Sequence, residues 1–227
     1  MKKVLIFSII IFSTASAAFA QKDAEAAAIL KKVSEQYRLY DVIKSDFSFS
    51  VNSQQGDMHI TESGTLYAKS KMNKFRVIIY APESTAAKQI IDQELISDGK
   101  TQWTYLKKDN EVQVTNADNS GEGFNPAKIF TIYEHGYKYI YNGEKKMDGK
   151  TYQEIDLTPE DADKEFFKVR LTIDKLKKQI YSALIFDKNG SHYTYTVRSF
   201  TGNPPVTENI FTFDPKEHKG VEVVDLK

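Results

Sequence analysis

The chain has 227 residues, of which 41% are hydrophobic and 12% aromatic, enough for one packed globular domain. Its 31 basic and 31 acidic residues cancel, which argues against nucleic acid or an anionic membrane surface as a partner. The sequence has no cysteine, which excludes disulfide bonds, thiol catalysis, cysteine-ligated zinc and a lipid anchor on cysteine.

The first 20 residues have the pattern of a secretory signal peptide. Two lysines precede an apolar run from Val4 to Phe12, and an Ala-Phe-Ala sequence stands directly before Gln21. The apolar run is shorter than a membrane-spanning helix requires. We therefore expect cleavage near Ala20/Gln21, export to the periplasm if the signal is bacterial, and a single domain over residues 21–227.

One amphipathic helix is predicted at the start of that domain, with Asp23 as its N-cap. Apolar residues recur at helical spacing, while charged residues such as Lys31 and Glu35 occupy the other side. The apolar face, which we expect to be buried, consists of Ala26, Ile29, Leu30, Val33 and Tyr37.

After this helix the hydrophobic period changes to two, which is typical of half-buried antiparallel strands. The alternating residues in the first half are Phe47, Phe49, Val51, Met58, Ile60, Phe75, Val77, Ile79, Trp103, Tyr105, Val112 and Val114. In the second half they are Tyr137, Tyr139, Tyr141, Phe167, Val169, Leu171, Ile173, Ile180, Leu184, Phe186, Tyr193, Tyr195 and Val197.

Short turns separate these segments and favour hairpins. The turns contain residues that tolerate positive φ, at Gln55-Gly56, Asp98-Gly99, Asp109-Asn110, Asp148-Gly149 and Asn189-Gly190. About ten or eleven strands result, more than a flat open sheet carries without curling. The predicted fold is mainly β with some α: a single, strongly curved antiparallel sheet that forms an unclosed β-barrel.

One segment interrupts the strand pattern. A polar, glycine-rich loop from Asn116 to Gly123 precedes Asn125-Pro126, a capping residue followed by proline at the first helical position. The short helix predicted over residues 126–135 carries Ile129, Phe130 and Tyr133 on one face. This pattern fits equally a movable lid and a structural plug, because both need one apolar face, and we take the helix to be a lid.

The sequence offers no recognisable catalytic machinery. The four histidines, His59, His135, His192 and His218, make no metal-binding pair, and no nucleophile-elbow, P-loop or dinucleotide motif is present. The acidic run from Asp161 to Glu165 lacks the spacing and glycine of an EF-hand. We expect no enzyme activity, no metal and no cofactor. The aromatic residues on strand after strand favour a hydrophobic pocket instead, because a wide half-barrel leaves room for an apolar ligand.

Several stretches, in this order, resemble the outer-membrane lipoprotein carrier protein (LolA) family. The most specific are Gly64-x-Leu66, Lys74-Phe75-Arg76, Ser97-Asp98-Gly99 with Trp103 and Tyr105, and the closing Phe213-x-Pro215 with Gly220-Val221. Together they cover nearly the whole chain after the signal peptide.

The resemblance implies a periplasmic chaperone that holds lipoprotein acyl chains in a concave apolar surface. Its expected partners are lipoproteins, an inner-membrane ABC transporter that releases them and, in some settings, an outer-membrane receptor; the protein is expected to be monomeric. The residues expected to line the acyl-chain site are Phe47, Phe49, Met58, Leu66, Phe75, Val77, Ile79, Trp103, Tyr105, Ile129, Phe130 and Tyr133.

The sequence departs from the family at one point. Family members place an Arg-Pro pair after the Gly-x-Leu strand, and that arginine helps to hold the lid closed, whereas this chain has Ser70-Lys71-Met72-Asn73. Lys71 lacks the planar fork of an arginine, so the latch is not carried over. Two other functions stay open, a binding module for another apolar ligand and, third, a lipid-modifying enzyme.

Overall fold

A computed structural model describes residues 14–53, 58–85, 87–117 and 126–227. Helix α1 (Thr14–Tyr37) comes first and is followed by a single sheet of twelve strands. The strands before the interruption are β1 (Ile43–Ser53), β2 (Met58–Lys69), β3 (Lys74–Tyr80), β4 (Ile91–Asp98), β5 (Thr101–Leu106) and β6 (Glu111–Asn116). Those after it are β7 (Tyr137–Met147), β8 (Lys150–Pro159), β9 (Phe166–Asp174), β10 (Gln179–Asp187), β11 (His192–Gly202) and β12 (Glu222–Asp225).

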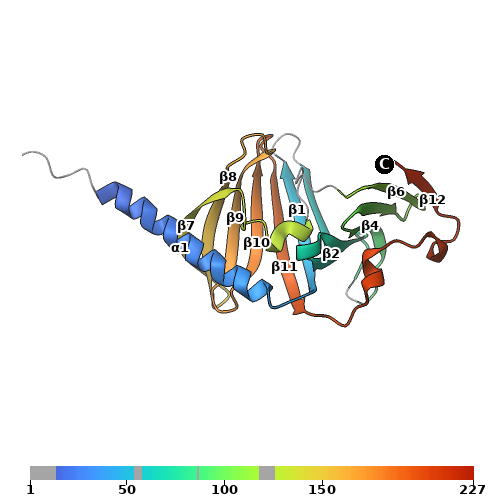
Figure 1. The fold of residues 1–227 in the computed structure, drawn as a ribbon, viewed down its shortest axis with the longest axis horizontal. Helices are drawn as coiled ribbons and strands as arrows, with labels where there is room; N and C mark the ends of the chain where they lie inside the picture. The colour runs from blue at the N-terminus through green and yellow to red at the C-terminus, as the bar shows by residue number, and fades with distance from the viewer. Residues whose placement is uncertain (1–13, 54–57, 86, 118–125) are drawn as a thin grey trace, which may run out of the picture.

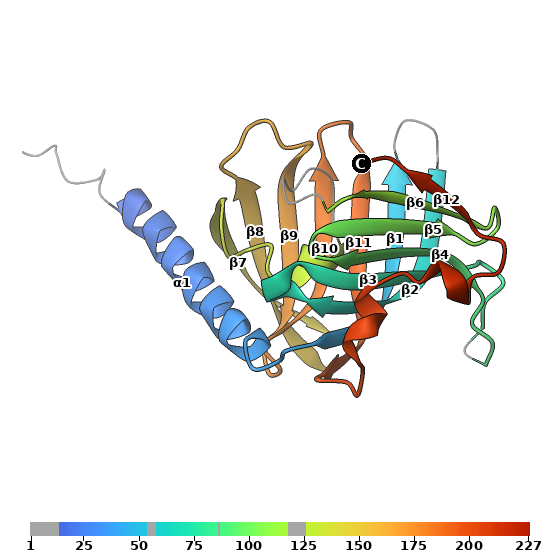
Figure 2. The same cartoon turned by 45° about the vertical axis from the view of Figure 1, so that its right-hand side comes forward.

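The sheet is open and strongly curved, which confirms the predicted unclosed barrel. Its order is β12-β6-β5-β4-β3-β2-β1-β11-β10-β9-β8-β7, so the first strand lies in the middle and bonds to both β2 and β11. Strands β3 to β6 run across the direction of β8 to β11 (Figures 1 and 2). The two halves therefore curve around a common concave face.

Two details of the predicted sheet are corrected. The sheet has twelve strands, and β12 pairs with β6 in parallel, whereas the other ladders are antiparallel. The parallel direction follows from the route of the chain, because residues 203–221 return along the outer face before β12 begins (Figure 1).

Most of the predicted hairpin turns have the expected backbone. Asp148 and Gly149 both have positive φ, of 49° and 72°, as a two-residue hairpin requires. Gly99, Asn110 and Gly190 also have positive φ. The Gln55-Gly56 turn lies outside the described residues.

The main core lies on the concave face. It contains alternate residues of the central strands, for example Phe47 on β1, whose ring stacks on that of Tyr195 at a centroid distance of 4.8 Å. The stack sits above Gly64 on β2, where a side chain would not fit. Strand alternation thus directs the aromatic residues of β1 and β11 into one interior.

Helix α1 covers one end of this face, with the predicted residues buried: Ala26, Ile29, Leu30, Val33 and Tyr37. The Ile180 N–H donates a hydrogen bond to the Tyr37 hydroxyl at 2.7 Å, and burial raises the pKa of Tyr37. Asp23 does not cap the helix, because the helix already begins at Thr14. No helix among the described residues is long and apolar enough to span a bilayer.

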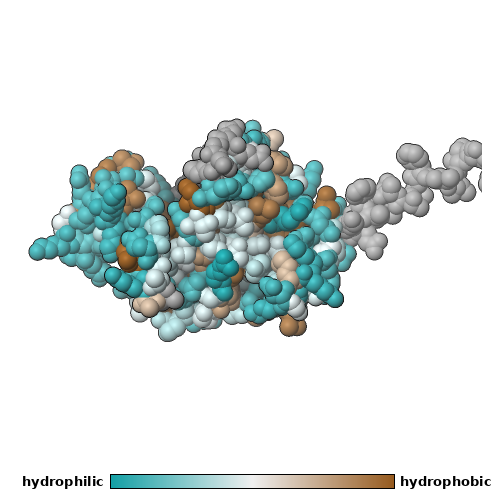
Figure 3. Space-filling view, turned by 180° about the vertical axis from the view of Figure 1, so that it is seen from behind, coloured by the Kyte–Doolittle hydropathy of each residue, from teal (hydrophilic) through white to brown (hydrophobic). Residues whose placement is uncertain are grey.

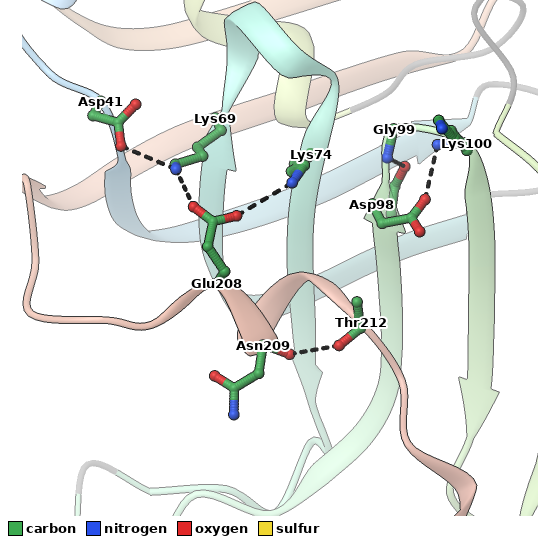
Figure 4. A network of polar contacts seen from close by, with 10 residues as sticks. Asp41, Lys69, Lys74, Asp98, Gly99, Lys100, Glu208, Asn209 and Thr212 are labelled. Atoms are coloured by element: carbon green, nitrogen blue, oxygen red, sulfur yellow. Dashed lines mark hydrogen bonds and ion pairs between the residues drawn. The ribbon is translucent and has the colours of Figure 1, made fainter.

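The outer face carries a second, smaller core beneath the C-terminal return segment, residues 203–221. An ionic clamp fixes the start of this segment, in which Glu208 pairs with Lys69 and, at 3.2 Å, with Lys74 (Figure 4). Lys69 also pairs with Asp41 at 3.0 Å. Seen from behind, the molecule shows mostly hydrophilic surface with scattered apolar side chains (Figure 3).

Asp156 on β8 and Arg170 on β9 form a bidentate ion pair on the outer face, with nitrogen to oxygen distances of 2.7 and 2.9 Å. Burial raises the pKa of Asp156, but hydrogen bonds from Arg170 and Asn142 outweigh it, so the pKa lies below its ordinary value. A depressed folded-state pKa means that the pair stabilises the fold above the unfolded value of about 3.9 and ceases to do so as the pH falls through the folded pKa.

We therefore expect Asp156→Asn to lower the free energy of unfolding by about 1 kcal/mol at pH 7. The difference from the wild type should shrink as the pH falls below about 4. Urea unfolding at pH 7 and pH 3 measures it, with the exposed Asp163→Asn as control. A difference that stays constant over this range would show that the pair does not stabilise the fold.

Candidate functional site

The concave face contains a cavity of about 370 Å³. Eight of the residues that line it are apolar or aromatic: Phe47, Phe49, Val77, Ile79, Leu95, Phe166, Ile185 and Tyr193. Four are polar: Glu62, Gln93, Glu165 and Asp187. The walls are therefore apolar, with carboxylates among the lining.

Seven neighbouring strands, from β4 through β1 to β9, position these side chains. Strand pairing brings residues on one face together, as in the pair Val77 and Leu95 and the pair Ile79 and Gln93. Phe49 stacks on Tyr193 across β1 and β11 with ring centroids 6.1 Å apart. The cavity thus follows from the period-two pattern of adjacent strands.

Two irregularities, one at Tyr181 in β10 and one at Phe167 in β9, correct the predicted alternation of these two strands. Register shifts lie between Ile180 and Ser182 and between Phe186 and Asp187. Each shift moves the following residues to the other face. Phe166 and Ile185 therefore face inward, whereas Phe167, Leu184 and Phe186, which alternation assigned to the buried face, do not line the cavity. Phe167 is 51% exposed.

Four of the twelve predicted site residues line the cavity, namely Phe47, Phe49, Val77 and Ile79. Leu66 and Phe75 belong to the same core but are fully buried beside the cavity rather than on its wall. The side chain of Met58 lies outside the described part of the chain.

The structure does not bring Trp103 and Tyr105 to this cavity. They lie in the second core, where Tyr105 packs against Phe213 at 5.3 Å and Trp103 against the same cluster. Trp103 pairs with Ile96, which faces away from the concave side, whereas Leu95 next to it faces the cavity. The expectation that these aromatics form the pocket wall is corrected, because they lie beneath the return segment.

Ile129, Phe130 and Tyr133 form an apolar cover at another part of the concave face. They belong to a 3-10 helix, η2 (Pro126–Phe130), and the turn after it, rather than to an α-helix. All three are buried, and the Phe130 ring meets the ring of Tyr37 edge-on at 5.0 Å. None lines the 370 Å³ cavity. Most of the predicted loop before η2, residues 118–123, lies outside the described residues.

Polar contacts join this cover to α1. The Ser34 hydroxyl donates a hydrogen bond to Glu134 at 2.6 Å, and Arg38 pairs with the same carboxylate at 3.5 Å. A separate cavity of about 80 Å³, lined by Phe130 and Tyr37 among others, lies at this junction. Burial raises the pKa of Tyr133, so its hydroxyl stays neutral.

The histidines do not line the cavity. His59 and His135 are exposed, His192 packs against Phe186, and His218 stacks on Phe213. Among the described residues, no group of three or more histidine or acidic side chains has the arrangement of a metal site.

The sequence matches the model of the family described as outer membrane lipoprotein carrier protein LolA over residues 38–214. The chain belongs to this family. No curated protein matches the sequence. Among solved structures, an uncharacterized conserved protein from Thermus thermophilus is similar at 16% identity and a TM-score of 0.57, over 88% of this chain and 99% of that one. A domain named for outer membrane lipoprotein sorting, from Vibrio parahaemolyticus, is similar at 12% identity and a TM-score of 0.51, over 85% and 97%. At these identities the likeness shows the fold.

This LolA-family chain forms a short 3-10 helix, η1 (Ser70–Met72), where the resemblance places the latch arginine. Lys71 and Met72 border the 80 Å³ cavity between η1, η2 and α1, and both are exposed. The polar contacts between the cover and the C-terminal end of α1 come from Ser34, Arg38 and Glu134 instead. No signal in the strand pattern pointed to these three residues.

Proposed function

We propose that the protein is a periplasmic carrier that shields the acyl chains of lipoproteins on their way from the inner to the outer membrane. The observation that supports this is an apolar cavity on the concave face of a LolA-family fold. Each methylene left in water costs about 0.8 kcal/mol, so an acyl chain needs such shielding to cross an aqueous compartment.

The size of the cavity limits what it holds as it stands. About 370 Å³ lies near the lower end of small-molecule sites, about 300–1,000 Å³, so several acyl chains require the concave face to widen. The same small volume supports a second candidate function, binding of a single-chain lipid. The mass of material that copurifies separates the two, because the carrier retains acylated protein and the second candidate retains free lipid.

The family and the signal peptide pattern support the setting that we propose. An inner-membrane ABC transporter would deliver the cargo, and the outer membrane, with or without a receptor, would accept it. In this scheme the protein binds and releases its cargo without catalysing a reaction, and the mainly apolar lining of the cavity supports a binding role.

Two adjacent residues on β3 give a matched test, because Ile79 lines the cavity while Ile78 faces the opposite side. Ile79→Trp fills part of the space and should weaken binding of a triacylated lipopeptide about tenfold or more. The added ring excludes about two methylenes of the acyl chain from the cavity, and each costs about 0.8 kcal/mol when it is left in water. Because about 1.4 kcal/mol corresponds to a factor of ten in affinity, this loss accounts for the expected weakening. Displacement of a fluorescent acyl probe measures the affinity.

Ile78→Trp, which adds the same side chain on the other face, should bind like the wild type. The emission of Trp103 should not change on binding, because that residue lies in the outer cluster. Equal affinities of the two variants and the wild type would remove the cavity from the binding site.

A further inference from the structure

Three carboxylates border the apolar cavity at positions accessible to solvent. Glu62 on β2 and Glu165 just before β9 are exposed, and Asp187 at the end of β10 is half-buried. Glu165 and Asp187 are held close together, because the backbone N–H of Lys188 donates to the Glu165 carbonyl at 2.9 Å. No lysine or arginine lines this cavity. We name Glu62, Glu165 and Asp187 the acidic rim.

The acidic rim is not neutralised by ion pairs within the described part of the chain. The ion pairs found there involve other acidic residues. The Lys188 ammonium, next to Asp187 in the sequence, donates instead to the Ala162 carbonyl at 2.5 Å. Three negative charges at the edge of a low-dielectric wall produce a potential that attracts cations.

We propose that the acidic rim selects lipoproteins whose residues just after the acylated N-terminus are basic. This rests on the proposed function, in which the acyl chains occupy the apolar wall. The peptide that follows the lipid must then leave the cavity toward water, and the solvent-accessible lining is where the carboxylates lie. Lysine or arginine at those positions would meet opposite charges, whereas acidic residues would be repelled.

Two lipopeptides that differ only in charge test the proposal: a tripalmitoyl-cysteinyl peptide followed by four lysines, and the same lipid followed by four glutamines. The wild type should bind the lysine form about tenfold more tightly at low salt. This preference should fall toward unity at about 1 M salt, where the Debye length is about 3 Å. The same lysine peptide without acyl chains should not bind measurably.

The triple variant Glu62→Gln, Glu165→Gln, Asp187→Asn should lose the preference and bind the lysine and glutamine lipopeptides with equal affinity. A control variant with the same change of net charge, at exposed residues away from the cavity, should keep the preference: Asp109→Asn, Glu217→Gln, Glu222→Gln. If the triple variant does not fold, the two single variants at the exposed Glu62 and Glu165 and the salt dependence of the wild type provide the same test.

The outcomes distinguish the role of the acidic rim from the proposed acyl-chain binding. A preference that is absent in the wild type, or that survives in the triple variant, overturns the role of the acidic rim while acyl binding stands. Tight binding of the unacylated lysine peptide also overturns the role of the acidic rim, because the peptide would then bind without acyl chains in the cavity. Failure of both lipopeptides to bind the wild type overturns the proposed function itself.

Discussion

Phe130→Ala is expected to lower the free energy of unfolding by about 3–5 kcal/mol, the range for a buried phenylalanine replaced by alanine. The Phe130 side chain is 1% exposed and its ring meets those of Tyr37 and Phe200, at 5.0 and 6.0 Å. It therefore joins η2, α1 and β11, and its loss leaves a void where all three meet. For a chain of this size we expect the melting temperature to fall by roughly 10 °C.

The control for this prediction is Ile132→Ala in the same segment. Because the Ile132 side chain is only half-buried, this substitution should lower the free energy of unfolding clearly less than Phe130→Ala does. The release rate of a bound lipopeptide, measured beside the melting temperature, should be unchanged in Phe130→Ala, because Phe130 does not line the cavity. Near-native stability combined with faster release would instead identify the segment as a lid.

The cover, although it is packed into the core of the unliganded protein, can still move when cargo binds. Burying about ten methylenes contributes about 8 kcal/mol, more than the expected cost of removing Phe130 from the core. Cargo that binds the widened state better than the closed state can therefore shift the equilibrium toward it. The contacts of Glu134 with Ser34 and Arg38 would be broken if the cover moved away from α1.

The sequence predicted the strands and their hairpins well because alternation and turn residues are local signals. It also predicted the buried face of α1, since Ala26 to Tyr37 follow a helical period. The predicted start of the helix was wrong. Asp23 has the chemistry of an N-cap, but nothing in the residues before it stops the helix from extending back to Thr14.

The position of Trp103 could not be predicted because alternation tells which residues share a face and not which face is the cavity. On β5 the alternation is clear: Trp103 and Tyr105 on one side, Gln102 and Thr104 on the other. Residues far along the chain decide the outcome, since Phe213 covers the outer side. The apolar side of β5 is thus buried away from the concave face.

The irregularities of β9 and β10 could not be predicted for a related reason. Phe166 and Phe167 are identical in chemistry, and only the register shift in β9, where Phe166 rather than Phe167 pairs with Asp187, decides that the first faces inward. A one-residue shift exchanges the two faces of a strand, so the cavity residues Phe166 and Ile185 depend on a feature that period-two reading does not detect.

Gly64→Ala is expected to destabilise the fold by about 3 kcal/mol or more, at the upper end of the range for overpacking. A Cβ at this position would overlap the carbonyl oxygen of Ile78 and lie 2.6 Å from Cζ of Phe47. The oxygen belongs to the backbone of β3 in the middle of the sheet, so it cannot move aside without disturbing the ladder between β2 and β3. Glycine in a strand is required by such a close approach.

Urea unfolding measures the effect as a lower midpoint at unchanged slope, with Ser63→Ala at the exposed neighbouring position as control. The Phe47 ring is the more mobile of the two obstacles, and it also lines the cavity. Any Gly64→Ala protein that folds should therefore have Phe47 displaced toward the cavity and bind the lipopeptide more weakly than the wild type. Stability within about 0.5 kcal/mol of the wild type, the range of ordinary surface substitutions, would contradict the close packing of Phe47 and Ile78 around Gly64. The glycine of the Gly-x-Leu motif thus links the packing of the central strands to the shape of the site, because the same ring rests on the glycine and forms the cavity wall.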